Sequence, residues 1–483
     1  MNQIQNKLLE SLKKYFGFNQ FKSGQEETLI SLLSGYSTLA ILPTGTGKSL
    51  CYQLFGKMTQ SKVLVISPLI SLMQDQVEQI KYQKLGGAIA LTSNLTGNER
   101  KYVLNHFDQF QFIFASPEIL QNQYLFNVIK NAHIGLMVVD EAHCIAQWGP
   151  DFRPDYLTLG KIRSQLGFPL TLALTATATP AVEREIQQQL RFENNSNTIR
   201  YSVNRPNIFL ATEILDNQEE KNRRLLELVQ QLKMPGLIYF SSKKVANEIT
   251  DLLDRKTNLR AAAYHADLSI EDRFSIQHQF IENKLDVVCA TSAFGMGINK
   301  KDIRFVLHYH LPADLESYVQ EIGRAGRDGA QSIAILLYCP GDEMIQQQIQ
   351  LNTLPDKNEI QYYAQHPKIM SLTNDDSIEI LNSFFKMGVS AEKLVHFFAQ
   401  RKVHKNQALL KVLAYINTKE CKRNFILNYF EEPDFIEHNR NCCSNNGEYD
   451  LKNLSLEREK YIKEHVKLKE YPNILQTLFN LQE

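Results

Sequence analysis

The sequence predicts an α/β fold in which two parallel-sheet domains follow one another and a smaller, mostly helical region ends the chain. Short apolar runs alternate with helical patterns up to about residue 205, and the same alternation begins again after Arg205-Pro206-Asn207. From about residue 346 the composition shifts to polar, helix-forming sequence rich in Gln, Asn, Lys and Glu. We therefore expect the domains to span residues 1–205, 206–345 and 346–483.

Each expected strand is a short apolar run, as is typical of strands that are buried on both faces of a parallel sheet. In the first domain the runs include residues 38–42, 63–67, 112–115, 137–140 and 172–175. In the second domain they are residues 237–240, 261–264, 286–290, 305–308 and 333–337. Only the first domain carries a Lys-Ser loop, so we expect two similar folds of which only the first has a nucleotide-binding loop.

The composition excludes several classes of protein. The 483 residues suffice for two or three domains, and a hydrophobic content of 43% supports ordinary globular cores. No apolar run approaches bilayer-spanning length and the N-terminus lacks a signal-peptide core, so we expect a cytoplasmic protein with no membrane partner. Seven cysteines in so long a chain do not indicate a disulfide scaffold. The formal net charge of zero leaves a nucleic-acid partner open, because a local basic groove can bind phosphates on a neutral protein.

A phosphate-binding loop is predicted after the first expected strand. The segment Ile41-Leu42-Pro43-Thr44-Gly45-Thr46-Gly47-Lys48-Ser49 precedes Leu50-Cys51-Tyr52-Gln53-Leu54, which can start a helix. Glycines let backbone N–H groups turn inward around a polyphosphate, and the helix N-terminus adds positive potential. The general pattern opens with Gly, where this chain has Leu42. Lys48 would hold the β- and γ-phosphates and Ser49 would bind Mg²⁺. The residues expected to line the nucleotide are Thr44, Gly45, Thr46, Gly47, Lys48 and Ser49.

Two adjacent carboxylates end another expected buried strand, Leu136-Met137-Val138-Val139. An ATP-hydrolysing site built on a phosphate loop needs an acid at a strand end for the Mg²⁺ shell, which would be Asp140. It needs a second acid to orient or deprotonate the attacking water, which would be Glu141. Paired acids can also be an ordinary solvated strand end, but together with the loop they favour catalysis.

The second domain offers two arginines that can complete the nucleotide site across a cleft. Arg324 and Arg327 lie three residues apart in Glu321-Ile322-Gly323-Arg324-Ala325-Gly326-Arg327-Asp328-Gly329, so they share a helix face or a tight turn. A guanidinium fork fits the charge that develops on a γ-phosphate better than an ammonium group does. A surface arginine pair is the alternative, but the surrounding glycines permit close approach and favour function.

With these motifs in this order, the chain resembles superfamily 2 helicases, and more closely the RecQ group of DNA helicases, over residues 10–340 and more weakly over 406–446. The resemblance implies two RecA-like domains in tandem. Phe16-Gly17-Phe18-Asn19-Gln20-Phe21-Lys22-Ser23-Gly24-Gln25 is similar to a RecQ segment in which a Gln reads adenine and an aromatic ring stacks on it. By position these residues are Gln25 and Phe18. Lys22 stands where the family usually has an Arg that stacks on the other face of the adenine.

Four further segments are similar to superfamily motifs. They are Ser67 to Gln76 (motif Ia, DNA backbone), Leu174 to Thr179 (motif III, coupling of ATP state to domain movement), Ala290 to Lys300 (motif V) and Gln320 to Gly329 (motif VI). The last of these segments adds Gln320 to the candidate catalytic residues.

The segment from Ala142 to Tyr156 is similar to the aromatic-rich loop of the RecQ family, and it holds the only Trp of the chain. Aromatic rings stack on bases without regard to sequence, and arginine binds phosphate. Trp148, Phe152 and Arg153 are therefore the expected DNA contacts. An ordinary core position is the alternative for Trp148.

From Cys421 onward the chain resembles the start of the RecQ zinc module. When Cys443-Ser444-Asn445-Asn446 is aligned on the family's usual Cys-x-x-Cys ending, Asn446 and Arg440 stand where the family has ligands. Because Zn²⁺ needs four nitrogen or sulfur ligands, a site here must add Cys442 or His438 to the remaining cysteines. The sequence leaves two possibilities open, a zinc site or a degenerate module that folds without metal. The candidate ligands are Cys421, His438, Cys442 and Cys443.

The resemblance implies a monomeric ATP-dependent DNA helicase that uses ATP and Mg²⁺ and works at the nucleoid in recombination or repair. It would move 3′ to 5′ on single-stranded DNA and unwind duplexes that carry a single-stranded overhang. Two alternatives stay open, an RNA helicase of the same superfamily and a DNA-binding regulatory module with weak ATPase activity. The aromatic loop and the Gln25 segment favour DNA over RNA, and the complete set of candidate catalytic residues argues against a decayed ATPase.

Overall fold

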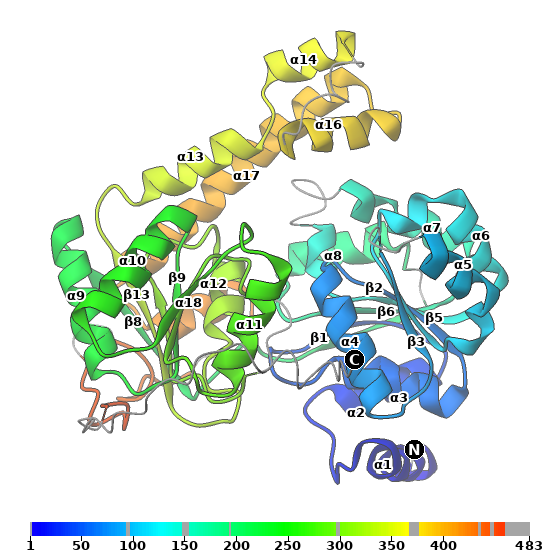
Figure 1. Ribbon diagram of the computed structural model, residues 1–483, viewed down its shortest axis with the longest axis horizontal. Helices are drawn as coiled ribbons and strands as arrows, with labels where there is room; N and C mark the ends of the chain where they lie inside the picture. The colour runs from blue at the N-terminus through cyan, green and yellow to red at the C-terminus, as the bar shows by residue number, and fades with distance from the viewer. Residues whose placement is uncertain are drawn as a thin grey trace, which may run out of the picture.

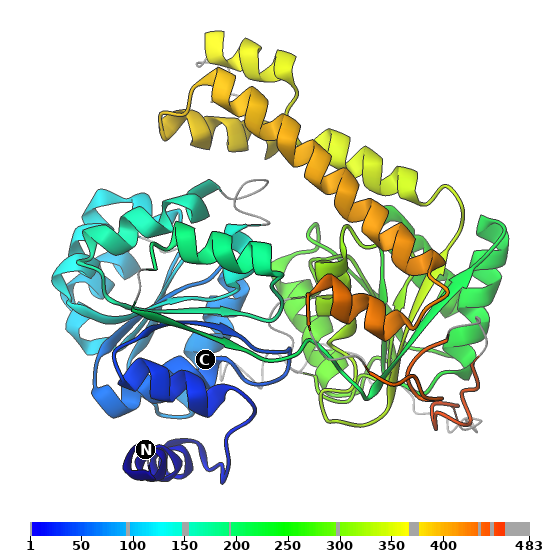
Figure 2. The same cartoon turned by 180° about the vertical axis from the view of Figure 1, so that it is seen from behind.

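Two parallel β-sheets flanked by helices form the two halves of the molecule, and an arm of long helices rises from the second half and reaches over the first (Figures 1 and 2). The structure is a computed structural model. It describes residues 2–92, 97–146, 154–192, 195–295, 300–366, 376–432, 436–444 and 449–458.

The first domain contains a seven-stranded sheet with the order β3-β4-β2-β5-β6-β1-β7, in which every neighbouring pair is parallel. Its strands are β1 (Ser37–Ile41), β2 (Lys62–Ile66), β3 (Ala88–Leu91), β4 (Phe112–Ala115), β5 (Ile134–Val139), β6 (Leu170–Thr175) and β7 (Ser196–Arg200). Its helices are α1 (Asn2–Phe16), α2 (Gln25–Leu33), α3 (Ser49–Thr59), α4 (Ile70–Tyr82), α5 (Gly97–Asn105), α6 (Gln123–Asn131), α7 (Leu159–Gln165) and α8 (Pro180–Gln189). Short 3₁₀ helices are η1 (Phe107–Gln109), η2 (Ile119–Gln121), η3 (Ala142–Ile145) and η4 (Pro154–Thr158).

The second domain contains a six-stranded sheet with the order β10-β11-β9-β12-β13-β8, again with parallel neighbours throughout. Its strands are β8 (Ile208–Ile214), β9 (Gly236–Tyr239), β10 (Ala261–Tyr264), β11 (Val287–Ala290), β12 (Phe305–His308) and β13 (Ser332–Tyr338). Its helices are α9 (Gln218–Gln231), α10 (Lys243–Lys256), α11 (Ile270–Ile281) and α12 (Leu315–Ile322). Each of these four helices begins after an Asn, Ser or Asp whose side chain accepts a hydrogen bond from the first turn.

Burial on both faces explains why these strands read as apolar runs. Each sheet has one hydrophobic core on either face, and strands β1, β4, β11 and β12 are buried along their whole length. The predicted fold class is confirmed, and every expected strand is present. The predicted helix after the phosphate loop is also present, as α3. The apolar-run reading did not name β3, β7 or β8.

The C-terminal region is helical, with α13 (Glu343–Thr353), α14 (Lys357–Gln365), α16 (Asp376–Lys386), α17 (Ala391–Asn417) and α18 (Lys422–Tyr429). The end of α17 and all of α18 pack on the second domain, because Leu409, Val412 and Leu427 join one of its cores. The start of α17 forms a separate cluster with α14 and α16. Leu157 of η4 packs against that cluster and Arg401 Nη1 donates to Ala146 O at 3.4 Å, so the arm contacts both domains.

Among the residues that the structure describes, no helix combines the length and the apolar character needed to cross a bilayer.

Candidate functional site

The phosphate loop lies at the carboxyl end of β1, the edge at which parallel sheets bind ligands. Leu42 N donates to Thr175 O at 2.9 Å, which continues the β1–β6 ladder into the loop. Gly45 and Gly47 have φ angles of +85° and +74°, a region that favours glycine. The loop leads into the N-terminus of α3 at Ser49, where the partial positive charge of the helix end favours an anion. This is the strand–loop–helix arrangement that the sequence predicted.

The acid pair lies at the same edge of the sheet, directly after β5. Only β6 separates β5 from β1, so Asp140 and the phosphate loop face a common space. Glu141 has a φ angle of +50°, and its backbone N–H donates to Asp140 Oδ1 at 3.1 Å. A non-glycine residue in this region stores about 1–3 kcal/mol of strain, and such residues cluster at functional sites. His143 Nδ1 lies 3.4 Å from Glu141 Oε2 and 3.1 Å from Thr175 Oγ1.

The second domain reaches the phosphate loop through the turn of residues 323–329, which follows α12. Thr44 Oγ1 donates to Gly323 O at 2.8 Å across the domain boundary. A Cβ atom at Gly323 would lie 2.5 Å from that same hydroxyl oxygen. A Cβ atom at Gly45 would lie 3.2 Å from Arg327 Cγ. The arginine-bearing turn therefore packs directly on the phosphate loop, and both sides need glycine at the contact.

The two predicted arginines of this turn create a cationic region beside the loop. Arg324 is buried and donates from Nη1 to Gly295 O, while its Nε has no hydrogen-bond partner among the described residues. Burial, followed by the charges of Arg324 and Arg205, lowers the pKa of Arg327 to about 9. Since like charges gathered in this way repel one another, an anion between the turn and the loop would be stabilised.

Gln320 links the second domain to the acid pair from another side. Its Nε2 donates to Thr177 Oγ1 at 3.0 Å and lies 3.4 Å from His143 Nε2. Burial lowers the pKa of His143, which favours the neutral imidazole. Thr175, in the segment similar to motif III, and Gln320, in the segment similar to motif VI, therefore both contact His143.

The segment predicted to bind adenine contacts the phosphate loop. Gln25 is buried, and its Nε2 donates to Thr46 O at 2.7 Å and to Gly47 O at 3.0 Å. Lys22 Nζ donates to Gly45 O at 2.8 Å. Phe18 is 55% exposed, so its ring is free to contact a ligand. Burial and the charges of Lys301 and Arg327 lower the pKa of Lys22.

The charges of the first domain are arranged around the loop. Burial lowers the pKa of Lys48, and the nearby charges of Glu141 and Asp140 oppose that shift. Burial and the charge of Glu141 raise the pKa of Asp140, while Lys48 opposes the shift. These mutual effects place the lysine and the two acids at one site.

The residues predicted to contact DNA, Trp148, Phe152 and Arg153, lie outside the described residues. The chain on either side of them is described. After the acid pair the described chain continues through η3 to Ala146, and it begins again with η4 at Pro154.

The four candidate zinc ligands converge at the end of α17. One ligand atom from each of Cys421, His438, Cys442 and Cys443 lies within 4.8 Å of all the others. Cys421 Sγ is 3.5 Å from Cys442 Sγ and 3.7 Å from Cys443 Sγ, and Cys443 Sγ is 3.6 Å from His438 Nδ1. The cluster therefore contains both adjacent cysteines and also His438, although the sequence required only one of Cys442 and His438.

Sequence reasoning assigned no site role to Arg205, His143 or Thr177, which the structure places at the domain junction. His143 and Thr177 stand inside motifs that the sequence had singled out, so their position in those motifs was a usable signal. Arg205 had no local signal, because its partners come from residues 323–326.

Comparisons with protein families agree with this geometry. The DEAD/DEAH box helicase family matches residues 22–185, the helicase conserved C-terminal domain matches residues 220–329 and the RecQ zinc-binding family matches residues 385–446. The three matches cover the phosphate loop with the acid pair, the arginine turn, and the cysteine–histidine cluster.

Individual relatives extend over most of the chain. It is 42% identical to "Probable ATP-dependent DNA helicase RecS" of Bacillus subtilis, over 92% of both chains. It is 34% identical to "ATP-dependent DNA helicase RecQ" of the same organism, over 91% of this chain and 67% of that protein. Among solved structures, yeast Dbp5 bound to RNA and ADP BeF3 has a TM-score of 0.57 at 21% identity, over 71% of this chain and 90% of that one, which shows the fold alone. The chain belongs to the RecQ family of superfamily 2 helicases.

Proposed function

We propose that this protein is an ATP-dependent DNA helicase that moves 3′ to 5′ along single-stranded DNA and unwinds duplexes with a single-stranded overhang. One observation carries the proposal beyond family membership. Arg327 of the second domain packs on Gly45 of the phosphate loop in the first domain, so the ATP site is shared by two domains. Closing and opening such a site during hydrolysis moves the domains relative to one another, which is what a translocating motor needs.

The residues at the shared site divide the work. Lys48 and the backbone of Thr44 to Ser49 hold the β- and γ-phosphates. Lys22 and Gln25 contact the loop, and together with the exposed Phe18 they bind the adenine. When the base binds, the Gln25 amide leaves the loop carbonyls and hydrogen-bonds to the base. The oxygen donors of Ser49 and Asp140 fit Mg²⁺, which supplies charge neutralisation for the phosphate oxygens when bound.

Hydrolysis is assigned to the acid pair and the arginine turn. Glu141 orients the attacking water and accepts its proton, in contact with His143. Arg324 and Arg327 stabilise the charge that develops on the γ-phosphate. The buried Nε of Arg324 has no hydrogen-bond partner among the described residues, which supports this role. Gln320 connects this chemistry to the second domain through Thr177 and His143.

A second part of the proposal is a Zn²⁺ ion held by Cys421, His438, Cys442 and Cys443. Three sulfurs and one imidazole nitrogen are a ligand set that Zn²⁺ prefers, and the four atoms already lie together. Metal analysis of the purified protein should give about one zinc per chain, which is the stoichiometry of a single four-ligand site. Removal of zinc by a chelator should lower the melting temperature, because metal binding contributes directly to folding. A protein that contains no metal and melts at the same temperature with and without chelator would contradict this assignment.

The domain boundaries 1–205, 206–345 and 346–483, a monomeric state, a place at the nucleoid and a role in recombination or repair belong to the same proposal. Trp148, Phe152 and Arg153 are the proposed DNA contacts.

The decisive experiment compares ATP hydrolysis without nucleic acid, with single-stranded DNA and with RNA of the same sequence. We expect strong stimulation by DNA and little by RNA. Unwinding is then measured on duplexes with a 3′ overhang, a 5′ overhang or blunt ends, and only the first should be opened efficiently. Stimulation by RNA alone would favour an RNA helicase, and hydrolysis indifferent to both would favour a regulatory module.

A further inference from the structure

Arg205 lies in the segment that joins the two sheets, between the end of β7 and the start of β8. Its guanidinium reaches the arginine-bearing turn and binds three backbone carbonyls there. Nη1 donates to Gly323 O at 2.9 Å, and Nη2 donates to Ala325 O at 2.9 Å and to Gly326 O at 2.8 Å. These carbonyls lie on both sides of Arg324 and directly before Arg327, so Arg205 holds the backbone from which both arginines project.

The turn depends on such bonds because it belongs to no regular helix or strand. Gly323 O accepts from Arg205 and also from Thr44 Oγ1 of the phosphate loop. Asn207, two residues after Arg205, donates from Nδ2 to Gly326 O at 2.8 Å and to Ala330 O at 2.9 Å. The connecting segment therefore fixes the turn at the point where the turn meets the loop.

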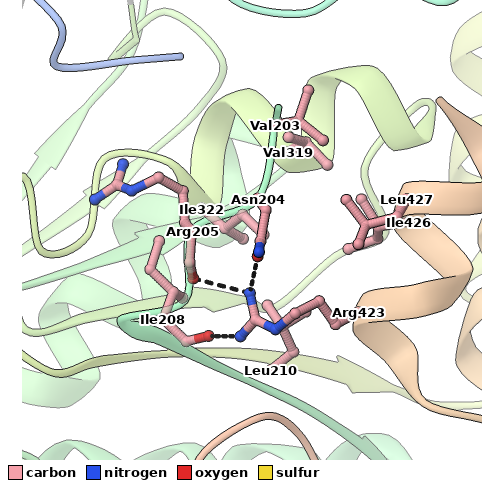
Figure 3. Close-up of a pocket in the computed structure, with 10 residues that line it drawn as sticks. All are labelled: Val203, Asn204, Arg205, Ile208, Leu210, Val319, Ile322, Arg423, Ile426 and Leu427. Atoms are coloured by element: carbon pink, nitrogen blue, oxygen red, sulfur yellow. Dashed lines mark hydrogen bonds between the residues drawn. The ribbon is translucent and has the colours of Figure 1, made fainter. Parts of the chain in front are cut away.

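Helix α18 of the C-terminal region also binds the connecting segment, through Arg423 (Figure 3). Arg423 of α18 is buried, and its Nη1 donates to Asn204 Oδ1 and to Arg205 O, both at 2.8 Å. Its Nη2 donates to Ile208 O at 2.5 Å. A small pocket at this place is lined by residues of the connecting segment, of α12 and of α18, including Arg423.

Arg423 also contacts the cysteine–histidine cluster. Its Nε donates to Cys442 Sγ at 3.3 Å and its Nη2 to Cys442 O at 3.1 Å. A guanidinium has five N–H donors in one plane and can bind a ligand of the cluster and the connecting segment at once, whereas an ammonium group cannot reproduce this fork. One continuous set of hydrogen bonds thus runs from Cys442 through Arg423 and Arg205 to the turn.

We propose that Arg205 is a positioning residue for ATP hydrolysis, which sets the place of Arg327 on the phosphate loop, and that Arg423 fixes Arg205 from the side of the cysteine–histidine cluster. This rests on the proposed function of Arg327. A purely structural role for Arg205 is the competing explanation, since a buried arginine that binds carbonyls also stabilises a fold. The two explanations differ in whether the effect of Arg205 passes through Arg327.

The test uses Arg205→Lys, Arg327→Ala and the double variant of the full-length protein, with DNA-stimulated kcat, KM for ATP and melting temperature measured for each. Arg163→Lys is the matched control, because Arg163 is a buried arginine that donates to the carbonyls of Leu190 and Arg191 inside the first domain. Turnover is expressed per chain that binds a nucleotide analogue, so unfolded protein does not count.

We expect Arg205→Lys to lower kcat by roughly tenfold to a hundredfold with little change in KM, as expected for a catalytic group displaced by about 1 Å. In the Arg327→Ala background the same substitution should lower kcat much less, because only the part of its effect that passes through Arg324 remains. Arg163→Lys should lower the melting temperature and leave kcat unchanged. A kcat loss that is equal in both backgrounds, or no loss at all, would overturn the proposal.

Arg423→Lys tests whether Arg423 fixes Arg205. It also replaces Arg205→Lys as the test variant if too little of the Arg205→Lys protein folds. We expect a smaller kcat loss that decreases further in the Arg327→Ala background while the zinc content is retained. An unchanged kcat with zinc retained would remove Arg423 from the proposal. Failure of the proposed function would look different, because the wild-type protein would then show no DNA-stimulated hydrolysis or Arg327→Ala would be as active as wild type.

Discussion

Replacing Arg327 with alanine should reduce the turnover of ATP far more than the binding of ATP. The structure gives the expected size of the effect. The side chain packs on Gly45, so its guanidinium can place two N–H donors on the γ-phosphate as that group acquires charge in the transition state. Hydrogen bonds to charged groups contribute about 1.5–3 kcal/mol each, so two amount to roughly 3–6 kcal/mol and a loss of about 10²- to 10⁴-fold in kcat.

The pH dependence provides an independent check on the same residue. The pKa of Arg327 is lowered to about 9 by burial and by the neighbouring arginines. As pH rises through that value the free enzyme loses the positive charge, so kcat/KM should fall. A bound triphosphate stabilises the charged form and raises the pKa again, so kcat should persist to higher pH than kcat/KM does. The Arg327→Ala variant should show a smaller alkaline loss, to which Lys48 still contributes because its pKa is also lowered by burial.

The assay is steady-state hydrolysis with saturating single-stranded DNA, together with the Kd of a nonhydrolysable ATP analogue. Arg224→Ala is the control, since Arg224 belongs to the same domain but pairs with Glu213 at 2.7 Å, and it should be nearly as active as wild type. A kcat loss below about tenfold in Arg327→Ala would be too small for an arginine that completes a phosphoryl-transfer site. Equal losses of binding and turnover would assign the residue to ground-state binding instead.

Three further predictions concern the first domain. Lys48→Ala should abolish hydrolysis while circular dichroism stays unchanged, and near-normal turnover in the folded variant would be incompatible with a phosphate-binding role. Glu141→Gln should bind the ATP analogue with wild-type affinity and hydrolyse no ATP, because an amide keeps the shape of the acid and cannot accept the proton; loss of binding would make Glu141 a ligand or structural group. Trp148→Ala should keep basal hydrolysis and lose both stimulation by DNA and unwinding, with about 1–3 kcal/mol of base stacking removed. A core role for Trp148 instead predicts a loss of about 3–5 kcal/mol of stability, visible in thermal melting, with every activity reduced together.

Three strands, β3, β7 and β8, were not predicted from the apolar runs of the sequence, and their positions in the sheets show the limits of that pattern. β3 and β7 are the two edges of the first sheet, so one side of each has no neighbouring strand in the part of the chain that the structure describes. The five residues Ser196–Arg200 of β7 include one apolar side chain and are only partly buried, so they carry no apolar run. β8 is different, because residues 208–211 are apolar and buried and the signal was present after Arg205-Pro206-Asn207.

The cysteine–histidine cluster shows a second limit of reasoning from the sequence. Alignment on the usual Cys-x-x-Cys ending put Arg440 and Asn446 at ligand positions, since a pattern read along the chain compares residues by spacing alone. The structure brings Cys442 and His438 to Cys421 instead, which follows from the backbone between residues 436 and 444 and not from sequence separation. The catalytic candidates needed no such information, because a phosphate loop and an acid at a strand end are local features of parallel sheets.

The contacts of the described chain on either side of residues 147–153 explain why Trp148→Ala is expected to separate basal from stimulated hydrolysis. The chain enters this segment through η3, which begins directly after Glu141 and contains His143, the partner of Glu141 and Gln320. Arg401 of the arm donates a hydrogen bond to Ala146 O, directly after η3. On the other side of residues 147–153, Leu157 packs on the arm. The arm packs on the second domain, so the chain on both sides of residues 147–153 contacts an element that is attached to that domain. DNA bound at residues 147–153 would therefore act on Glu141 and on the domain boundary together, whereas hydrolysis without DNA needs only the residues of the nucleotide site.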